Sequence, residues 1–277
     1  MMNPGNFRNV LRQKLESAGV ENSGQESLWF CAAAANLSPA EFSVSEQCLS
    51  ADVMEKAESF VQRRIKGEPL QYILGNEYFG DLEFLVGPGV LIPRPETYFM
   101  VEFATAFLPN GGAFCELGTG SGAVALSVAS LRRDVSVYAS EISPEAIRWA
   151  LKNRENLDLP EADIRLGSFF DPFPADMKFD CVAANLPYIP MSEQPGLQKE
   201  VRDFEPARAL FADDAGMADI KVALQLLPAR LLPGGRAIFE GGSEQMEPLK
   251  VFAEKLFPHV SIANDLFNRP RFLVIQT

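Results

Sequence analysis

From residue 113 onward, short apolar runs alternate with longer segments whose apolar residues recur at helical spacing. The short runs predict strands at 113–117, 135–140, 163–166, 181–184, 236–240 and 271–275, and the longer segments predict helices at 123–131, 144–153 and 217–232. Strands that alternate with helices form a mainly parallel sheet with helices on its faces. This part of the chain is therefore expected to adopt an α/β fold.

The N-terminal part of the chain has a different pattern. Residues 6–66 predict helices with short turns, and Ser38-Pro39-Ala40-Glu41 has the composition of a capped helix start. Residues 72–92 combine aromatic and β-branched residues with four glycines, which predicts a β-hairpin with strands at 78–79 and 82–86. We expect an N-terminal helical domain at 1–75, a β-hairpin linker at 76–94 and the α/β domain at 95–277.

The composition of the 277 residues argues against several classes of protein. The net charge is −12, whereas tight binding to nucleic acid through its phosphates requires a basic surface. Residues 1–20 carry charges and contain no apolar run, unlike a signal peptide or a membrane span. We therefore expect a cytoplasmic protein without tight nucleic-acid binding and without a membrane. The sequence does not fix the oligomeric state; a monomer is our expectation.

Cysteine and histidine usage excludes other kinds of site. The four cysteines, Cys31, Cys48, Cys115 and Cys181, are far apart and form no CxxC pair, so neither a disulfide framework nor a metal site is expected. We expect these cysteines to be small buried residues. The single histidine, His259, lies outside any candidate cluster, so a Ser-His or Cys-His nucleophile would lack its base.

The stretch Asn185-Leu186-Pro187-Tyr188 follows a predicted buried strand and resembles the start of a functional loop. Asn185 offers a side-chain carbonyl oxygen and Leu186 a backbone carbonyl oxygen, whose direction Pro187 restricts. Two neighbouring acceptors suit one planar NH2 group, and Tyr188 adds an aromatic face for a flat amide or base. The alternative is a strand that simply ends at a proline turn.

A second candidate site lies in the first strand–helix unit of the α/β part. Residues 116–122, Glu-Leu-Gly-Thr-Gly-Ser-Gly, end a strand and open a helix, and their glycines allow a ligand to approach the backbone closely. Glu141 ends the next strand, where a carboxylate can accept hydrogen bonds from both ribose hydroxyls. Together they indicate an adenosine-containing ligand, although the loop lacks the G-x-G-x-x-G spacing of an NAD site. A helix-capping or solvated carboxylate is the alternative for Glu116 and Glu141.

Five motifs in order carry a resemblance to a known family. They are 67–75 (GEPLQYILG), 91–97 (LIPRPET), 116–122 (ELGTGSG), 185–190 (NLPYIP) and 200–206 (EVRDFEP). The glycine loop, second acidic residue and Asn-x-Pro-Tyr strand end resemble class I S-adenosylmethionine-dependent methyltransferases, and the whole set resembles the peptide chain release factor glutamine methyltransferases. The resemblance runs from about residue 60 to residue 240. It implies a Rossmann-like methyltransferase domain with a small N-terminal helical bundle and a β-hairpin linker.

The resemblance also implies an activity connected with translation termination. A methyl group would pass from S-adenosyl-L-methionine to the side-chain amide nitrogen of the glutamine in the Gly-Gly-Gln motif of a class 1 peptide chain release factor. Catalytic roles are implied for Asn185, Pro187 and Tyr188, and substrate binding for these residues with Leu186. Cofactor contacts are implied for Arg94, Pro95, Thr97, Glu116, Gly118, Thr119, Gly120, Ser121, Gly122, Glu141, Phe169 and Asn185. Phe169 is equally consistent with the protein core.

Three stretches depart from the family pattern and leave alternatives open. The usual tetrapeptide is Asn-Pro-Pro-Tyr, so Leu186 replaces a proline and brings an N–H group that needs a partner. Residues 239–242 and 265–271 follow the family only roughly. Other readings are methylation of another protein glutamine, such as one in a ribosomal protein, methylation of an adenine in nucleic acid, and a non-catalytic binding protein with the same fold.

Overall fold

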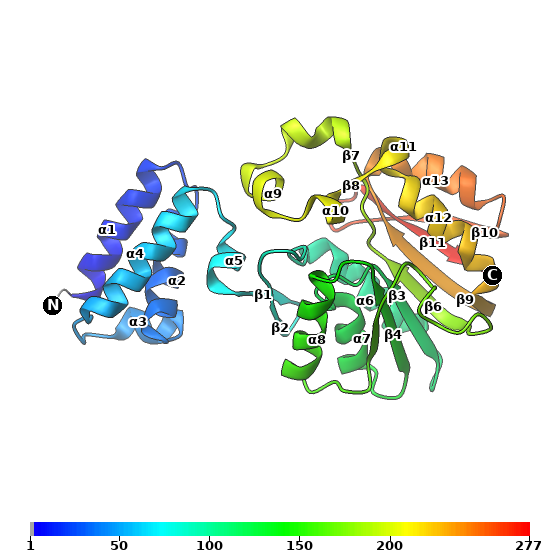
Figure 1. Cartoon of the computed structure of the whole chain (residues 1–277), viewed down its shortest axis with the longest axis horizontal. Coiled ribbons are helices and arrows are strands. Elements are labelled where there is room, and N and C mark those ends of the chain that lie inside the picture. The colour runs from blue at the N-terminus through cyan, green and yellow to red at the C-terminus, as the bar shows by residue number, and fades with distance from the viewer. Residues whose placement is uncertain (1–2) are drawn as a thin grey trace. The chain divides into compact units, whose positions relative to one another are not determined.

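Five helices form the N-terminal part of the chain in the computed structural model, which describes residues 3–277. They are α1 (Pro4–Ser17), α2 (Ser23–Ala35), α3 (Pro39–Val44), α4 (Ala51–Ile65) and α5 (Leu70–Leu74) (Figure 1). Apolar side chains on their facing sides, among them Leu11, Phe30 and Val61, are buried in one core. Burial of these apolar faces stabilises helices that would be marginal in isolation.

Side chains cap the starts of α1 and α3. The Asn3 side chain accepts a hydrogen bond from the backbone N–H of Gly5 at 2.9 Å, and Pro4 occupies the first turn of α1. At α3, Ser38 accepts from the N–H of Glu41, while the Glu41 carboxylate accepts from the N–H of Ser38. This capping box confirms the predicted helix start.

One element of the helical unit comes from far along the chain. The chain divides into two units, and the helical one contains the residues up to Gly75 together with Gln198–Phe204, which carry α9 (Lys199–Phe204). Arg64 on α4 donates hydrogen bonds to Glu26 on α2 and to Glu200 on α9, each at 2.7 Å. The sequence analysis assigns residues 198–204 to the C-terminal domain, because a local pattern gives no information on ion pairs between residues far apart in sequence.

The second unit consists of Asn76–Leu197 and Glu205–Thr277 and begins with the predicted hairpin. Strand β1 (Asn76–Phe79) pairs antiparallel with β2 (Leu82–Leu85). Gly80 makes the turn with φ +60°, a conformation that favours glycine. The hairpin confirms the predicted strands to within a few residues.

A seven-stranded sheet lies at the centre of this second unit (Figure 1). Its strand order is β10-β11-β9-β6-β3-β4-β5. The strands are β3 (Ala113–Leu117), β4 (Ser136–Glu141), β5 (Asp163–Leu166), β6 (Phe179–Ala184), β9 (Leu231–Glu240), β10 (His259–Asn264) and β11 (Pro270–Gln276). Strands β9, β6, β3, β4 and β5 are parallel to one another, whereas β11 pairs antiparallel with β9 and β10 pairs antiparallel with β11. The predicted α/β fold with a mainly parallel sheet is confirmed.

Helices cover both faces of the sheet, and alternate strand residues point to opposite cores. On β3, Phe114 belongs to the core under α6 (Tyr98–Phe107), α7 (Ala123–Leu131) and α8 (Ala146–Asn156). Its neighbour Cys115 belongs to the other core, under α12 (Ala218–Leu226) and α13 (Met246–Ala253). Because both faces are buried, these strands appear in the sequence as continuous apolar runs.

Short elements fill the connections. They are η1 (Pro95–Thr97), β7 (Ile189–Pro190), η2 (Met191–Gly196), α10 (Ala207–Leu210), β8 (Phe211–Ala212), α11 (Asp213–Gly216), η3 (Leu227–Ala229) and η4 (Ser243–Gln245). Strands β7 and β8 pair with each other in parallel.

None of the helices within residues 3–277 has the length and apolar character needed to cross a membrane.

Two expectations about local structure are wrong, and one strand was not predicted. The helix predicted at 217–232 ends at Leu226, and a 3-10 turn containing Pro228 follows, because proline cannot continue an α-helix. Strand β10 is missing from the prediction, since it is an edge strand whose residues are exposed or half-buried. Cys48 is exposed, unlike the three other cysteines.

Candidate functional site

A cavity of about 300 Å³ opens at the carboxyl ends of the parallel strands β3, β4 and β6. This edge of an open α/β sheet is where ligands usually bind. The predicted site residues in its lining are Arg94, Thr97, Glu116, Gly118, Thr119, Gly120, Ser121, Glu141, Phe169, Asn185, Leu186 and Pro187. The fold thus brings together residues from five separate segments of the sequence.

The glycine loop forms the floor of this cavity between β3 and α7. Gly118, Gly120 and Gly122 have φ values of +69°, +58° and +85°, which residues with a side chain rarely adopt. A Cβ atom added to Gly120 would meet only Val90 Cγ2, at 4.0 Å. The backbone at Gly120 is therefore open to a ligand, while Gly122 lies outside the cavity lining at the start of α7.

Glu141 at the end of β4 connects the glycine loop to the next helix. One carboxylate oxygen accepts from the N–H of Gly120 at 2.8 Å, and the other accepts from the N–H of Ser143 at 2.7 Å. Burial raises the pKa of Glu141, and these two backbone N–H groups oppose that rise. The carboxylate keeps further lone pairs for a ligand, because each oxygen can accept more than one hydrogen bond.

Glu116 at the end of β3 lines the cavity but is itself only 3% exposed. One of its oxygens accepts hydrogen bonds from the Thr119 hydroxyl and from the backbone N–H of Ala125, the latter at 2.8 Å. Burial raises the pKa of Glu116 to about 8. At neutral pH this carboxyl is therefore mainly protonated, and it connects the glycine loop to α7.

Asn185 follows β6 directly and lies half-buried at the cavity. Its amide nitrogen donates to the Thr97 hydroxyl oxygen at 3.2 Å, and the Thr97 hydroxyl donates to Glu240 at 2.7 Å. Glu240 ends β9 and is completely buried. Burial raises the pKa of Glu240, whereas the neighbouring Arg271 opposes the rise. Within residues 3–277, no hydrogen bond reaches the side-chain oxygen of Asn185 or the backbone carbonyl oxygen of Leu186.

Tyr188 is held on the other side of the loop and is absent from the cavity lining. Its hydroxyl accepts a hydrogen bond from Arg271 at 2.6 Å, and the Arg271 guanidinium lies 5.1 Å from its ring centre. Its backbone carbonyl accepts from the Gln245 side chain at 2.6 Å. Burial raises the pKa of Tyr188 to about 12, so the hydroxyl stays protonated at neutral pH.

Leu186 and Arg94 also belong to the cavity lining. The Leu186 side chain is buried, and one of its methyl carbons would lie 3.0 Å from a Cβ atom at Gly118. Arg94 pairs with Glu205, which is buried and also accepts a hydrogen bond from the N–H of Ile92 at 3.2 Å. This pair fixes the segment before η1, whose first residue, Pro95, is not part of the lining.

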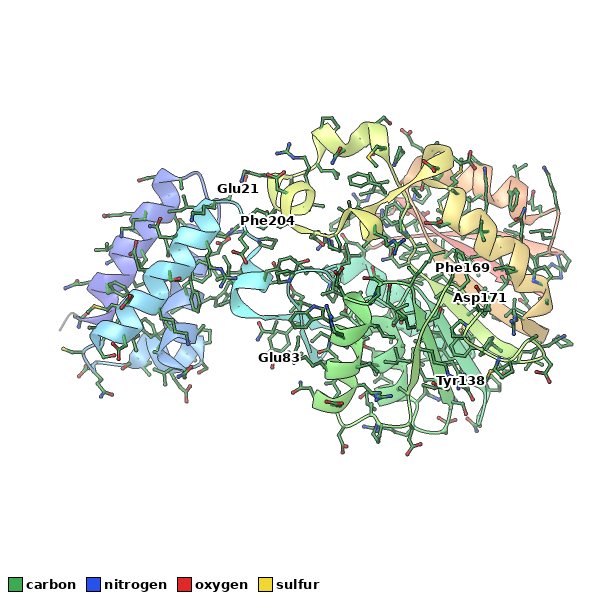
Figure 2. The ribbon with its side chains drawn as sticks, in the orientation of Figure 1. Glu21, Glu83, Tyr138, Phe169, Asp171 and Phe204 are labelled. Atoms are coloured by element: carbon green, nitrogen blue, oxygen red, sulfur yellow. The ribbon has the colours of Figure 1, made fainter. Side chains whose placement is uncertain are left out.

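Phe169 lies on the segment that follows β5 (Figure 2). It is half-buried, lines the cavity and has φ +45°, whereas the adjacent Phe170 is buried in the core. Tyr138, on β4, packs in the core against Phe173 and Phe179 at ring-centre distances of 5.8 and 5.7 Å. Of these aromatic residues, only Phe169 is available to a ligand in the cavity.

Sequence reasoning assigned no role to four residues that hold the site together, namely Glu205, Glu240, Gln245 and Arg271. One signal for Glu240 was present in the sequence. It ends a predicted strand of the same parallel sheet as Glu116 and Glu141, and parallel strands present their carboxyl ends at one edge. The partners of the other three lie too far away in sequence for any local pattern to reveal them.

The fold of the second unit resembles solved methyltransferase structures. One is the 16S rRNA N2 G1207 methyltransferase of T. thermophilus in complex with AdoMet and guanosine, with a TM-score of 0.52 and 17% identity over 73% of this chain and 49% of that chain. Another is a methyltransferase from Pyrococcus furiosus, with a TM-score of 0.52 and 19% identity over 71% of this chain and 89% of that chain. At these identities the likeness concerns the fold alone.

Two family models match the chain. The PrmC N-terminal domain matches residues 8–75, and a methyltransferase domain matches residues 108–250. The release factor glutamine methyltransferase of Neisseria gonorrhoeae is 41% identical over 217 residues, which are 78% of this chain and 79% of that protein. The protein of the same name from Geobacter sulfurreducens is 37% identical over 85% of this chain and 83% of its own length. The chain therefore belongs to the release factor glutamine methyltransferase family.

Proposed function

We propose that this protein transfers a methyl group from S-adenosyl-L-methionine to the side-chain amide nitrogen of the glutamine in a release factor Gly-Gly-Gln motif. One observation carries the proposal. Asn185 and Leu186 are consecutive residues in the cavity lining, and neither Asn185 Oδ1 nor the Leu186 carbonyl oxygen accepts a hydrogen bond from residues 3–277. A primary amide has two N–H donors on one nitrogen, so it suits this pair.

Such a pair of acceptors addresses the chemical difficulty of the reaction. An amide nitrogen is a weak nucleophile because its lone pair is delocalised into the carbonyl group. Two fixed acceptors orient the nitrogen and favour the positive charge that develops on it during methyl transfer. No general base has to act before the transfer, which agrees with the position of the only histidine, His259, on the edge strand β10.

The residues at the cavity fit the cofactor. The glycine loop leaves open space at Gly120, and the Glu141 carboxylate can accept from ribose hydroxyls while it keeps its two backbone donors. A volume of about 300 Å³ is within the range of small-molecule sites. When bound, S-adenosyl-L-methionine supplies a methyl group on an electron-poor sulfonium. The predicted contacts from Arg94, Thr97 and Phe169 belong to this proposal.

The relatives support a release factor as the substrate. They are named release factor glutamine methyltransferases, and the similarity to this chain covers most of their length. The net charge of −12 disfavours nucleic acid as the acceptor. We also propose residues 1–75 as an N-terminal helical domain, supported by the family match at 8–75, with a linker at 76–94 and a catalytic domain at 95–277. Release factors act in the cytoplasm, which is where the proposal places this protein.

The test is a methylation assay on a purified release factor. The protein is incubated with the cofactor and the release factor, and peptides are mapped by mass spectrometry for the addition of one CH2 group. We expect the added mass on the Gly-Gly-Gln glutamine, and none on a release factor whose glutamine is replaced by glutamate. Modification of a different residue, or none when calorimetry shows cofactor binding, would contradict the proposed acceptor.

A further inference from the structure

Three buried or half-buried side chains form a short chain of hydrogen bonds behind the acceptor pair. Asn185 Nδ2 donates to Thr97 Oγ1 at 3.2 Å, and Thr97 Oγ1 donates to Glu240 Oε2 at 2.7 Å. These residues come from the end of β6, from η1 and from the end of β9. Thr97 is 5% exposed and Glu240 is fully buried, so water does not compete for these bonds.

The chemistry of the three groups fixes the direction of each bond. An ionised carboxylate can only accept, so the single hydroxyl proton of Thr97 points to Glu240. The Thr97 oxygen can then only accept, and it takes a proton of the Asn185 NH2 group. The amide of Asn185 therefore presents Oδ1, and not Nδ2, away from Thr97, which leaves that oxygen without a partner in residues 3–277.

Arg271 fixes Glu240 from its other side. Its Nη2 donates to Glu240 Oε1 at 2.8 Å and to the Tyr188 hydroxyl at 2.6 Å. Because an arginine side chain can only donate, the Glu240 oxygen that it contacts, Oε1, must be an acceptor. The other carboxylate oxygen, Oε2, is then the one that accepts from Thr97. One ion pair between the half-buried Arg271 and the buried Glu240 thus holds both ends of the Asn185–Tyr188 tetrapeptide, Asn185 through Thr97 and Tyr188 directly.

We infer that Glu240, acting through Thr97, is a positioning residue that sets which atom of the Asn185 amide faces the acceptor amide of the substrate. The inference rests on the proposed function and deepens it. If the Asn185 amide were turned around, its NH2 group would meet the substrate NH2 group, and two donors would face each other. The glutamine could then not be oriented for transfer, whereas the glycine loop and Glu141 would be unaffected.

The most discriminating substitution is Glu240→Gln. The glutamine oxygen is drawn to Arg271, which can only donate, and its NH2 group then faces Thr97. The direction of both hydrogen bonds reverses: the Thr97 hydroxyl accepts from Gln, donates to Asn185 Oδ1 and turns the Asn185 NH2 group outward. Replacement of one oxygen atom of Glu240 by nitrogen therefore puts a donor in place of the Asn185 acceptor, while the Leu186 carbonyl is unchanged. In a Thr97→Val background, which interrupts the chain, Glu240→Gln has little additional effect.

The kinetic experiment compares these variants in release factor methylation. We expect Thr97→Val and Glu240→Gln each to lower kcat by about 10- to 100-fold. Glu240 lies outside the cavity lining, so Glu240→Gln keeps the cofactor Kd within about 3-fold of wild type. Thr97→Ser restores the hydroxyl and most of the rate. Thr105→Val on α6, whose hydroxyl bonds only within its own helix, is the matched control with wild-type kinetics. A near-normal kcat for Glu240→Gln, or a Thr97→Val defect confined to cofactor Kd, would overturn the inference.

A second readout separates this inference from the proposed function. The side-chain NH2 signals of Asn185 in an NMR spectrum of the labelled protein are identified by their loss in Asn185→Ala. We expect slow exchange with water in wild type and Thr97→Ser, and fast exchange in Thr97→Val. This pattern supports the hydrogen-bond chain even when no release factor is methylated. Equal exchange in all three proteins refutes it, whatever the substrate.

Discussion

The Thr97 hydroxyl donates to the carboxylate of Glu240 at 2.7 Å, although 143 positions separate the two residues in sequence. Thr97 precedes the seven-stranded sheet in sequence, and Glu240 ends β9, an inner strand of that sheet. The contact therefore forms only when η1 is packed against the end of β9. Since Asn185 binds to the same hydroxyl, the acceptor pair of the proposed active site depends on the assembly of the whole domain.

Gly216 is expected to be sensitive to any side chain. It has φ +83°, and a Cβ atom there would lie 2.0 Å from the carbonyl oxygen of Tyr188. We predict that Gly216→Ala displaces the tetrapeptide, destabilises the protein by about 2 kcal/mol or more and lowers methyl transfer. Urea denaturation and the methylation assay measure the two effects.

Gly234→Ala is the matched control for this prediction. Gly234 also has a left-handed conformation, with φ +79°, but a Cβ atom there would meet nothing within 4 Å. The substitution should therefore cost about 1 kcal/mol of backbone strain without loss of activity per folded molecule. Equal losses of stability and activity in the two variants would show that the contact with Tyr188 is unimportant.

Leu186→Ala separates the backbone of the tetrapeptide from its side chain. The proposed acceptor is the Leu186 carbonyl, which the substitution retains, whereas the side chain is 6% exposed and packs in the core. We predict a loss of stability of about 2 to 5 kcal/mol with a methylation rate per folded molecule close to wild type. A rate loss that exceeds the unfolded fraction would mean that the side chain itself shapes the acceptor site.

The raised pKa of Glu116 predicts that its contribution to the free energy of unfolding decreases as the pH rises. Its pKa is raised from 4.5 to about 8 by burial, so the folded state holds this proton more tightly than the unfolded chain. The contribution of Glu116 to stability is complete at low pH and is lost as the pH rises through about 8, by up to about 1.4 kcal/mol per pH unit. Glu116→Gln removes this dependence.

The measurement is urea denaturation of wild type and Glu116→Gln at several pH values between about 6 and 8. The free energy of unfolding of wild type, relative to that of the variant, should decrease as the pH rises. The glutamine oxygen can still accept from Thr119 and Ala125, so the variant should fold. A difference that is constant or increases with pH would show that Glu116 is ionised in the folded protein.

Arg64 is expected to be critical within the helical unit. Its side chain is 14% exposed and that of Glu26 is 6% exposed, so removal of the arginine leaves a buried carboxylate unpaired. We predict that Arg64→Ala costs about 3 kcal/mol, whereas Arg12→Ala, whose pair with Glu16 is exposed, costs about 0.5 kcal/mol. Limited proteolysis should also show faster cleavage in residues 198–204 of the Arg64 variant. Similar stabilities of the two variants would contradict this account.

A site residue could be predicted from the sequence when the pattern that marks it is local, and not when its partners lie far away along the chain. The glycine loop, Glu141 and Asn185 each belong to a local strand-end pattern, and the parallel sheet brings such strand ends to one edge. Their positions in the cavity lining could therefore be expected. Arg271 could not, because its partners Tyr188 and Glu240 lie 83 and 31 positions away.

Local sequence patterns also could not predict the edge strand and one of the connecting turns. Strand β10 is half-exposed, so it lacks the continuous apolar run of the central strands. The residues Asp214 and Ala215, which adopt left-handed conformations next to Gly216, carry no signal for such a turn. The Ala215 carbonyl and the Tyr188 carbonyl both accept from the Gln245 side chain, at 2.8 and 2.6 Å, so the contact that holds Ala215 comes from a residue 30 positions away.

The most direct test of the proposed function is single-turnover methylation of a release factor by Asn185→Ala, with cofactor binding measured by calorimetry on the same samples. The account predicts that the rate falls by about 1,000-fold or more, because the amide nitrogen is no longer oriented, while the cofactor binds and the protein remains folded. A rate within about 10-fold of wild type would contradict the assignment of Asn185 as the acceptor of the substrate NH2 group.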